Sequence, residues 1–342
     1  MIPPHRILVV APSWIGDTVM MQPLLARLQA RVPNSQIDVL APAWSAPLLA
    51  RMAEVHQSIA SPFTHGSFGL GERWRLGRQL AANRYQQAYV LPNTWKSALV
   101  PLFAGIGHRT GYLGEVRYGL LNDIRRLNAA AMPRLVDRYA HLADPADSAD
   151  SDLPPSDTPA PKLQSAPEQQ DQARHAFGLA IGTNLAIFCP GAEFGPAKRW
   201  PARHFAHVAT ALQAKDWQVA LVGSHKDAAI GEEIVRLSEG KVRNLCGQTN
   251  LMQAIDLIAS AQFVLTNDSG LMHVAAALDR PLIALFGSSS PAYTPPLSAR
   301  AKILSLNLPC APCFQRQCPL GHLNCLNQLE PQTVLDAFFN HA

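Results

Sequence analysis

Short apolar runs alternate with longer amphipathic segments along most of this chain. Each apolar run is bounded by Gly, Pro, Asn, Asp or Ser, a pattern typical of buried strands. The predicted strands cover residues 7–10, 37–40, 88–91, 185–188, 218–222, 242–245, 263–265 and 282–286. The predicted helices cover residues 18–30, 45–52, 71–83, 96–104, 132–142, 201–215, 227–237, 251–260, 271–279 and 331–339. Strands that alternate with helices in this way predict an α/β fold built on parallel sheets.

The alternation is interrupted once, at residues 144–167. This stretch holds six prolines and five aspartates and almost no large apolar residue, which predicts an exposed linker. The linker separates an N-terminal domain, 1–143, from a C-terminal domain, 168–330, with a final helical segment at 331–342. A length of 342 residues also favours two domains over one. We therefore predict two Rossmann-like domains that face each other across a cleft.

Charge is spread unevenly between the two halves. Residues 1–143 carry a net charge of +8 and residues 144–342 a net charge of −4. A basic N-terminal half suits a phosphorylated partner or an anionic membrane surface, although simple solvation of surface helices explains many of these charges. Nucleic acid is disfavoured, because aromatic and basic residues are not interleaved as in single-strand binders. The chain shows neither a signal-peptide pattern nor an apolar run of membrane-spanning length, so we expect a cytoplasmic protein.

A polar turn at residues 266–270 follows the strand predicted at 263–265 and precedes a helix of small residues. Backbone N–H groups at such a helix start, together with the helix dipole, favour an anion such as phosphate. His273 lies three residues after Gly270 and faces the same end of the helix. The alternative is a well-capped strand–helix unit that binds no ligand.

Three other strand ends in the C-terminal half also carry Gly or Ser, at Gly191, Gly223 and Gly287. On a parallel sheet these ends lie along one edge, where together they can surround a nucleotide diphosphate. Lys198 and Arg199 follow the first of these loops and could neutralise the diphosphate, unless they form only a basic surface turn. None of the glycines belongs to a P-loop or a GxGxxG fingerprint, which disfavours ATPases and nicotinamide oxidoreductases.

In the N-terminal half, Asp17 lies where the first strand meets the first helix. One interpretation is a helix N-cap. The other is a functional carboxylate at the carboxyl edge of a parallel sheet, where open α/β sheets bind ligands. Pro23 falls early in the same helix, where it costs little or introduces a kink. Residues 105–121 are rich in Gly, Arg and Tyr and have weak periodicity, which predicts a loop-rich surface.

Four cysteines gather near the C-terminus, at Cys310, Cys313, Cys318 and Cys325, with His322 beside them. Their spacing is close to that of a structural zinc site. Free thiols in a loop, or a pair of redox-labile disulfides, are the alternatives. Cys189 and Cys246 lie in or beside strand ends and are interpreted as buried thiols.

Six long motifs resemble those of the lipopolysaccharide heptosyltransferases, glycosyltransferase family 9. They are APSWIGD at 11–17, VLAPAW at 39–44, YVLPNTWKSALVP at 89–101, HRTGYLGEVRYGLLND at 108–123, CPGAEFGPAKRWP at 189–201 and TNDSGLMHVAAALDRPL at 266–282. The resemblance implies a GT-B fold in which the N-terminal domain binds the acceptor and the C-terminal domain binds ADP-heptose. It also implies that the final helix packs back toward the N-terminal domain.

The activity implied by this resemblance is inverting transfer of L-glycero-D-manno-heptose from ADP-heptose in lipopolysaccharide inner-core biosynthesis. The branch of the family that the motifs resemble adds this sugar to the first heptose of heptosyl-Kdo2-lipid A. The branch that acts on Kdo2-lipid A is the alternative, and a non-catalytic nucleotide-sugar-binding protein is an alternative of another class. The implied chemistry needs no metal or other cofactor. The implied partners are ADP-heptose, the lipid A–Kdo–heptose acceptor and, peripherally, the cytoplasmic face of the inner membrane.

The resemblance also assigns roles to individual residues. Asp17 matches the catalytic base, and Lys198 matches the lysine that contacts the diphosphate and supports catalysis. The donor site implied by the motifs comprises Gly191, Glu193, Lys198, Arg199, Gly223, Asp227, Asp268, Ser269, Gly270 and His273. Within it, Asp227 is the candidate for the ribose hydroxyls. The acceptor carries carboxylates and phosphates, for which Lys96, Arg109 and Arg117 are the candidate contacts.

Overall fold

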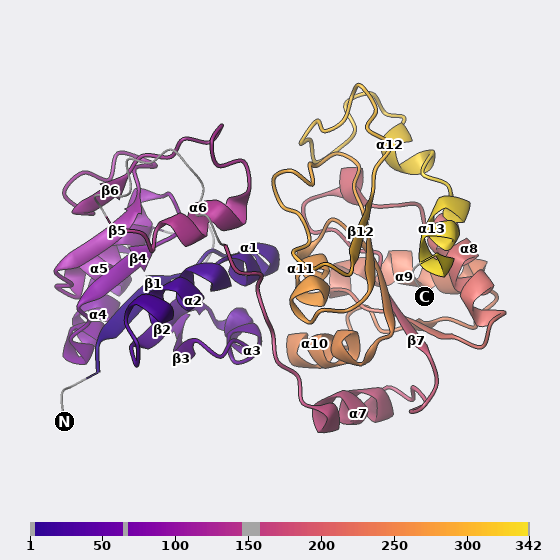
Figure 1. The fold of residues 1–342 in the computed structure, drawn as a ribbon, viewed down its shortest axis with the longest axis horizontal. Coiled ribbons are helices and arrows are strands. Elements are labelled where there is room, and N and C mark those ends of the chain that lie inside the picture. The colour runs from indigo at the N-terminus through magenta and orange to yellow at the C-terminus, as the bar shows by residue number, and fades with distance from the viewer. Residues whose placement is uncertain (1–3, 64–67, 146–157, 341–342) are drawn as a thin grey trace. The chain divides into compact units, whose positions relative to one another are not determined.

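The chain divides into two compact units, Met1–Pro161 (unit 1) and Lys162–Ala342 (unit 2). The computed structural model describes residues 4–63, 68–145 and 158–340 (Figure 1). Half of the predicted linker, residues 146–157, therefore lies outside the described residues. Unit 2 begins before position 168, because Leu163 is buried and its N–H donates to the carbonyl of Ala277 at 2.9 Å.

Unit 1 is one six-stranded sheet with helices between its strands. The strands are β1 (Arg6–Val10), β2 (Gln36–Pro42), β3 (Val55–Ser61), β4 (Gln87–Val90), β5 (His108–Tyr112) and β6 (Asp123–Arg125). The α-helices are α1 (Ile15–Met20), α2 (Gln22–Arg31), α3 (Ala46–Leu49), α4 (Leu70–Leu80), α5 (Leu99–Phe103) and α6 (Leu135–His141). The 3₁₀ turns are η1 (Ala43–Ser45), η2 (Ala81–Asn83) and η3 (Trp95–Ala98).

Unit 2 repeats this architecture. Its strands are β7 (Leu185–Cys189), β8 (Gln218–Leu221), β9 (Arg243–Asn244), β10 (Phe263–Asn267), β11 (Leu282–Leu285) and β12 (Ala301–Leu304). Its helices are α7 (Pro167–Ala176), α8 (Ala202–Gln213), α9 (Ala228–Leu237), α10 (Leu251–Ser260), α11 (Gly270–Ala277), α12 (Asn324–Asn327) and α13 (Pro331–Phe339). The 3₁₀ turns are η5 (Pro196–Lys198) and η6 (His225–Asp227).

The two sheets have the same strand order. Unit 1 runs β3-β2-β1-β4-β5-β6, and unit 2 runs β12-β11-β10-β7-β8-β9, which is the same order read from the other edge. All strand pairs are parallel, as in Leu265 of β10 beside Phe188 of β7. The order reverses between β1 and β4 in unit 1 and between β10 and β7 in unit 2. Open sheets of this kind bind ligands at the carboxyl ends of the strands at this switch point.

Both faces of each sheet are covered. In β1, Leu8 and Val10 belong to a core cluster with residues of α4 and α5, while Ile7 and Val9 point to the opposite face and are fully buried. In unit 2, Phe188 packs on Phe205 of α8, with ring centroids 6.0 Å apart. The structure thus confirms the predicted α/β class with two Rossmann-like units.

The C-terminal helix α13 contributes to the core of unit 2. Its Val334 and Phe338 are buried in the core cluster of unit 2, and the Phe338 ring lies 4.6 Å from that of Phe263. Full burial of side chains of this size contributes about 1.5–3 kcal/mol each. The apolar face of this helix is therefore part of unit 2, and the expected packing of segment 331–342 toward the N-terminal domain stays a prediction.

Two local predictions also change. The first helix, predicted to run unbroken over 18–30, is split into α1 and α2 at Met21, with Pro23 in the first turn of α2. Proline has no N–H to bond the preceding turn, so the break lies where its cost is smallest. The stretch 105–121, predicted as a loop-rich surface, contains strand β5. Among the described helices, none is both long enough and apolar enough to span a membrane.

Candidate active site

The loops after β7 and β10 meet at the switch point of unit 2. The first loop ends in η5 with Lys198, and the second carries Asp268 immediately after β10. Lys198 Nζ lies 2.5 Å from Asp268 Oδ2. The structure therefore brings together two predicted donor-site residues that are 70 positions apart in the sequence.

Asp268 is the centre of this group. Its side chain is 5% exposed, and Ser289, from the loop after β11, also donates a hydrogen bond to Oδ2. A buried carboxylate needs such partners, because removing a charge from water is costly. Ser289 was not among the predicted site residues. The sequence signal that could have identified Ser289 is its position shortly after Gly287, at the end of a predicted strand.

His273, on the first turns of α11, is buried beside this pair. Burial lowers the pKa of His273 to about 4; Asp268 opposes this shift and Lys198 adds to it. The imidazole is therefore neutral at ordinary pH, and the positive charge of the group comes from Lys198. Ser269 is the N-cap residue of α11 but makes no side-chain cap hydrogen bond. Capping alone, the alternative considered for this turn, thus does not explain Ser269.

Asn267, a residue that the sequence did not single out, fixes the geometry of the two loops. Its Nδ2 donates to the carbonyl of Pro190 at 2.7 Å, and its Oδ1 accepts from the N–H of Trp200 at 3.1 Å. Trp200 is fully buried, and its indole N–H donates to the carbonyl of Leu329 at 2.8 Å. These bonds hold the segment 190–200, and with it Lys198, against the end of β10.

The predicted residues around β8 form a second group. Asp227 caps its own turn, since its Oδ2 accepts from Ser224 N at 2.9 Å and from Ser224 Oγ at 2.7 Å. Arg199 lies 3.6 Å from the other carboxylate oxygen of Asp227. A Cβ on Gly191 would lie 2.3–2.5 Å from the Asp227 carboxyl atoms, so only glycine fits there. One on Gly223 would also meet Asp227, at 3.1 Å.

Glu193 has a more peripheral place than the other donor candidates. It forms an ion pair with Lys226 on the surface, where both side chains are largely exposed. Such exposed ion pairs contribute little to stability, so the Glu193 carboxylate can exchange Lys226 for a ligand at low cost.

In unit 1, Asp17 lies on α1, which follows β1 at the switch point of that sheet. The N-cap of α1 is Trp14, and Asp17 lies in the first turn. The N-cap interpretation of Asp17 is therefore wrong, although a carboxylate in the first turn still interacts favourably with the helix dipole. Lys96 lies in η3, which follows β4, the strand beside β1. Asp17 and Lys96 thus lie in the two segments that follow β1 and β4, the strands on either side of the switch point.

Arg117 is not placed to contact an acceptor. Its side chain is fully buried, and its guanidinium donates to the carbonyls of Pro92 and Tyr112. Burial lowers the pKa of Arg117 to about 10, so the side chain keeps its charge at neutral pH. The expected acceptor contact is therefore corrected to a structural one, because Arg117 ties the loop after β4 to that after β5.

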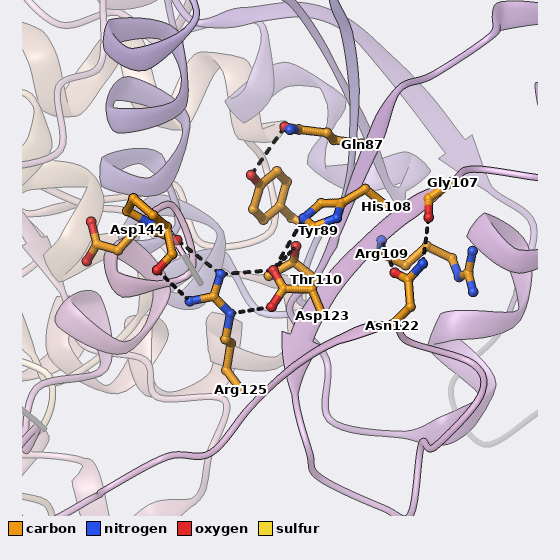
Figure 2. Close-up of polar contacts among 11 residues, drawn as sticks. Gln87, Tyr89, Gly107, His108, Arg109, Thr110, Asn122, Asp123, Arg125 and Asp144 are labelled. Carbon is orange, nitrogen blue, oxygen red and sulfur yellow. Dashed lines mark hydrogen bonds and ion pairs between the residues drawn. The ribbon is translucent and has the colours of Figure 1, made fainter. Parts of the chain in front are cut away.

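Arg109 is also engaged with the backbone. Its Nε donates to the carbonyl of Leu120 at 2.7 Å and its Nη1 to that of Ile106 at 2.5 Å. The loop around it is closed by Asn122, which accepts from Arg109 N at 2.8 Å and donates to the carbonyl of Gly107 at 2.6 Å (Figure 2). Arg109, like Arg117, therefore uses its guanidinium to bind backbone carbonyls of its own unit.

A further polar network, which the sequence did not indicate, surrounds Asp123 at the edge of the same sheet (Figure 2). Arg125 binds both Asp123 oxygens, at 2.6 and 2.9 Å, and Thr110 donates to one of them at 2.9 Å. Burial alone would raise the pKa of Asp123, but the bonds from Arg125 and Thr110 hold it below its usual value. Arg125 also donates to the carbonyl of Asp144 at 3.0 Å. The network thus holds the chain at Asp144, shortly after the end of α6.

The exposed large apolar side chains described in unit 1 lie in segments that follow the strands β1 to β5. They are Trp14, Trp44, Phe68, Leu70, Trp74, Trp95, Val116 and Tyr118. Four of them are tryptophans that are 41–55% exposed. In the described part of unit 2, the exposed apolar residues include no tryptophan. We call this set the aromatic edge.

The cysteines of the chain are free thiols of two kinds. Cys189 and Cys246 are buried, as expected, and burial raises the pKa of both. Burial and three neighbouring thiols raise the pKa of Cys325, whereas the backbone N–H of Leu323 lowers that of Cys318. Within the described ranges, no group of three or more metal-ligating side chains is arranged at metal-binding distance.

Known proteins are similar to this chain in sequence. Residues 73–324 match glycosyltransferase family 9 (heptosyltransferase). The chain is 48% identical to lipopolysaccharide heptosyltransferase 2 of Escherichia coli K12 over 336 residues, 97% of each chain. It is 50% identical to lipooligosaccharide heptosyltransferase 2 of Haemophilus influenzae over 312 residues, 88% of each.

The fold agrees with these similarities. The solved structure of the E. coli ADP-heptose lipopolysaccharide heptosyltransferase II superposes with a TM-score of 0.89 at 47% identity, covering 98% of each chain. Both units of the present chain are thus of the kind found in that glycosyltransferase. On its sequence and its fold, this chain belongs to glycosyltransferase family 9, the heptosyltransferases.

Proposed function

We propose that this chain transfers L-glycero-D-manno-heptose from ADP-heptose to the first heptose of heptosyl-Kdo2-lipid A, with inversion at the anomeric carbon. The observation that carries the proposal is the Lys198–Asp268 pair at the switch point of unit 2. Extended similarity to proteins named heptosyltransferase 2 supports the choice of donor and acceptor.

The donor diphosphate requires positive charge and N–H donors at its position. Lys198 supplies a cation, and the start of α11 supplies backbone N–H groups and the positive end of a helix dipole. Because Asp268 and the loop bonds of Asn267 hold Lys198 in place, it needs little reorganisation when the phosphate oxygens take on charge. Gly191, Gly223, Glu193, Arg199 and Asp227 complete the donor site, with Asp227 beside the ribose. We propose that this site needs no metal for catalysis.

The acceptor hydroxyl requires a base. In the proposed step its oxygen forms a bond to the anomeric carbon, while the bond from that carbon to the diphosphate oxygen breaks. Asp17 accepts the hydroxyl proton, and ADP leaves with the bonding electron pair. Asp17 suits this role because it lies at the switch point of unit 1 on a half-buried first helical turn.

Unit 1 suits a lipid-linked acceptor at a membrane surface. Tryptophan is favoured at membrane interfaces, and the aromatic edge carries four of them. The net charge of +8 over residues 1–143 favours anionic lipids and the anionic acceptor. We propose that the aromatic edge contacts the cytoplasmic face of the inner membrane peripherally, with Lys96 near the anionic part of the acceptor. Arg109, near the start of β5, adds to the positive charge of this unit.

The first test of the proposed function is the acceptor. Purified protein with ADP-heptose should transfer one heptose to heptosyl-Kdo2-lipid A and none to Kdo2-lipid A that lacks heptose, as measured by mass spectrometry of the lipid product. Transfer to the heptose-free acceptor alone would assign the alternative branch. Tight ADP-heptose binding without transfer to either would favour a binding protein.

Two substitutions should separate the roles of the two units. Asp17→Asn removes the base and should lower kcat by about 10²–10⁴-fold, with donor binding unchanged in calorimetry. Lys198→Ala should lower kcat by about 10²-fold and raise the donor KM, because the leaving diphosphate loses its cation. Lys198→Arg, which keeps the charge, is the matched control and should retain more activity than Lys198→Ala. Turnover of Asp17→Asn at the wild-type rate would remove Asp17 as the base.

The pH dependence should show that Lys198, and not His273, provides the charge. Because burial lowers the pKa of His273 to about 4, the ring is neutral above pH ~5 and gains its proton only in more acidic solution. The donor KM should therefore stay flat from pH 6 to 8 in both wild type and His273→Gln. A KM that rises about tenfold through pH ~6.5 in wild type, and not in the variant, would show a charged His273.

The membrane contact can be tested with vesicles. Trp74→Ser, which changes a side chain that is 55% exposed, should weaken co-sedimentation with phosphatidylglycerol vesicles about tenfold or more, since burial of a large apolar side chain contributes about 1.5–3 kcal/mol. Ile181→Ser, a similarly exposed position in unit 2, is the control and should bind as wild type does. Equal effects of the two substitutions would exclude the aromatic edge as the contact.

A further inference from the structure

The four C-terminal cysteines surround one pocket of unit 2. The pocket is lined by Cys310, Cys313, Cys318 and Cys325, together with His322 and two residues of other loops, Ala197 and Ser288. Cys325 has the other three thiols as its electrostatic neighbours. Residues spread over sixteen positions are thus gathered around one space, which the sequence spacing alone could not show.

The backbone around these thiols is arranged to favour sulfur as an acceptor. Cys318 Sγ accepts the N–H of Leu323 at 3.4 Å, and the N–H groups of Leu320, Gly321 and His322 also point to it. Three residues here have left-handed backbones: Phe314, directly after Cys313, with φ of 54°, Gly321 with 72° and Leu323 with 49°. For Phe and Leu this conformation costs about 1–2 kcal/mol, so the surrounding structure must impose it.

The same segment supports the donor-site loops. The carbonyl of Arg316 accepts the N–H of Ala197 at 3.1 Å, next to Lys198, and a Cβ on Gly195 would meet that carbonyl at 2.4 Å. The N–H of Phe314 donates to the carbonyl of Ser288 at 2.7 Å, next to Ser289. Both loops that present charged or polar groups to Asp268 are therefore held by the backbone of the cysteine segment.

We propose that Cys310, Cys313, Cys318 and Cys325 bind one structural Zn²⁺, which fixes the segment that supports Lys198 and Ser289. Four thiolates form a closed tetrahedral zinc site, and N–H groups that point at sulfur are partners that stabilise thiolates. Binding replaces the four thiol protons by the metal and requires the sulfurs to draw together from their positions around the pocket. His322 is not one of the ligands, since its Nδ1 accepts the N–H of Asn324 at 3.0 Å.

This site is distinct from the proposed transfer chemistry. The metal touches neither the donor nor the base, and its effect on transfer is through the position of Lys198. Its presence can therefore be measured without a transfer assay, and only the kinetic consequence rests on the proposed function.

The test is metal content of the full chain, purified under reducing conditions and reconstituted with Zn²⁺. Wild type should hold about one zinc per chain, the stoichiometry of a closed four-thiolate site. Cys313→Ser and Cys318→Ser should lose the metal, unfold at a lower temperature and show a higher donor KM. Cys246→Ala and His322→Ala are the matched controls and should keep about one zinc per chain.

A second measurement avoids variants that fail to fold. Co²⁺ added to metal-free wild type should give the intense visible absorption of a tetrahedral thiolate site, and Zn²⁺ should abolish it. A zinc content near zero with four titratable thiols would overturn the proposal. Disulfides among these cysteines that survive reduction would also overturn the proposal. Iron at one per chain would overturn the assignment of the metal as zinc. Zinc retained by Cys313→Ser but lost from His322→Ala would overturn the ligand set.

Discussion

The proposed donor site depends on one buried ion pair, between Lys198 and Asp268. Asp268 is almost fully removed from water, and Lys198 and Ser289 supply the partners that a buried carboxylate requires. His273 lies beside the same pair, and burial is the main cause of its lowered pKa. The close approach of the two loops in turn depends on Asn267, which bonds the loop after β7 from the end of β10. A diphosphate that arrives here meets a cation whose position is already fixed.

The strands that could be predicted from the sequence are those whose residues are buried on both faces of the sheet. Strands β1, β7 and β10 are covered on both faces, so each appears as a continuous apolar run. Strand β3 has the sequence VHQSIAS and is mostly exposed, and β5, with the sequence HRTGY, begins with exposed polar residues. Their pairing comes from backbone hydrogen bonds, which leave no apolar pattern in the sequence, so both were missed.

The candidate site could be predicted in its residue types but not in its contacts. Asp268 was recognised because it lies just beyond a strand end, and Lys198 because it follows the loop after another strand. Their pairing requires β7 and β10 to be neighbours, which the chain order hides because β8 and β9 come between them. Arg117 shows the opposite failure. Charge made it an acceptor candidate, whereas three-dimensional context directs its guanidinium to buried carbonyls.

The two units share a strand order but differ in chemistry at their switch points. Unit 2 presents a fixed cation, a buried carboxylate and small residues, which suit a leaving group that gains negative charge. Unit 1 presents Asp17 at its switch point and exposed tryptophans in the segments that follow its strands, which suit the proposed base and the proposed contact with a membrane. A base beside Lys198 would be paired and weakened by that cation. Placing the proposed base on a separate sheet lets each carboxylate keep the environment that its proposed role requires.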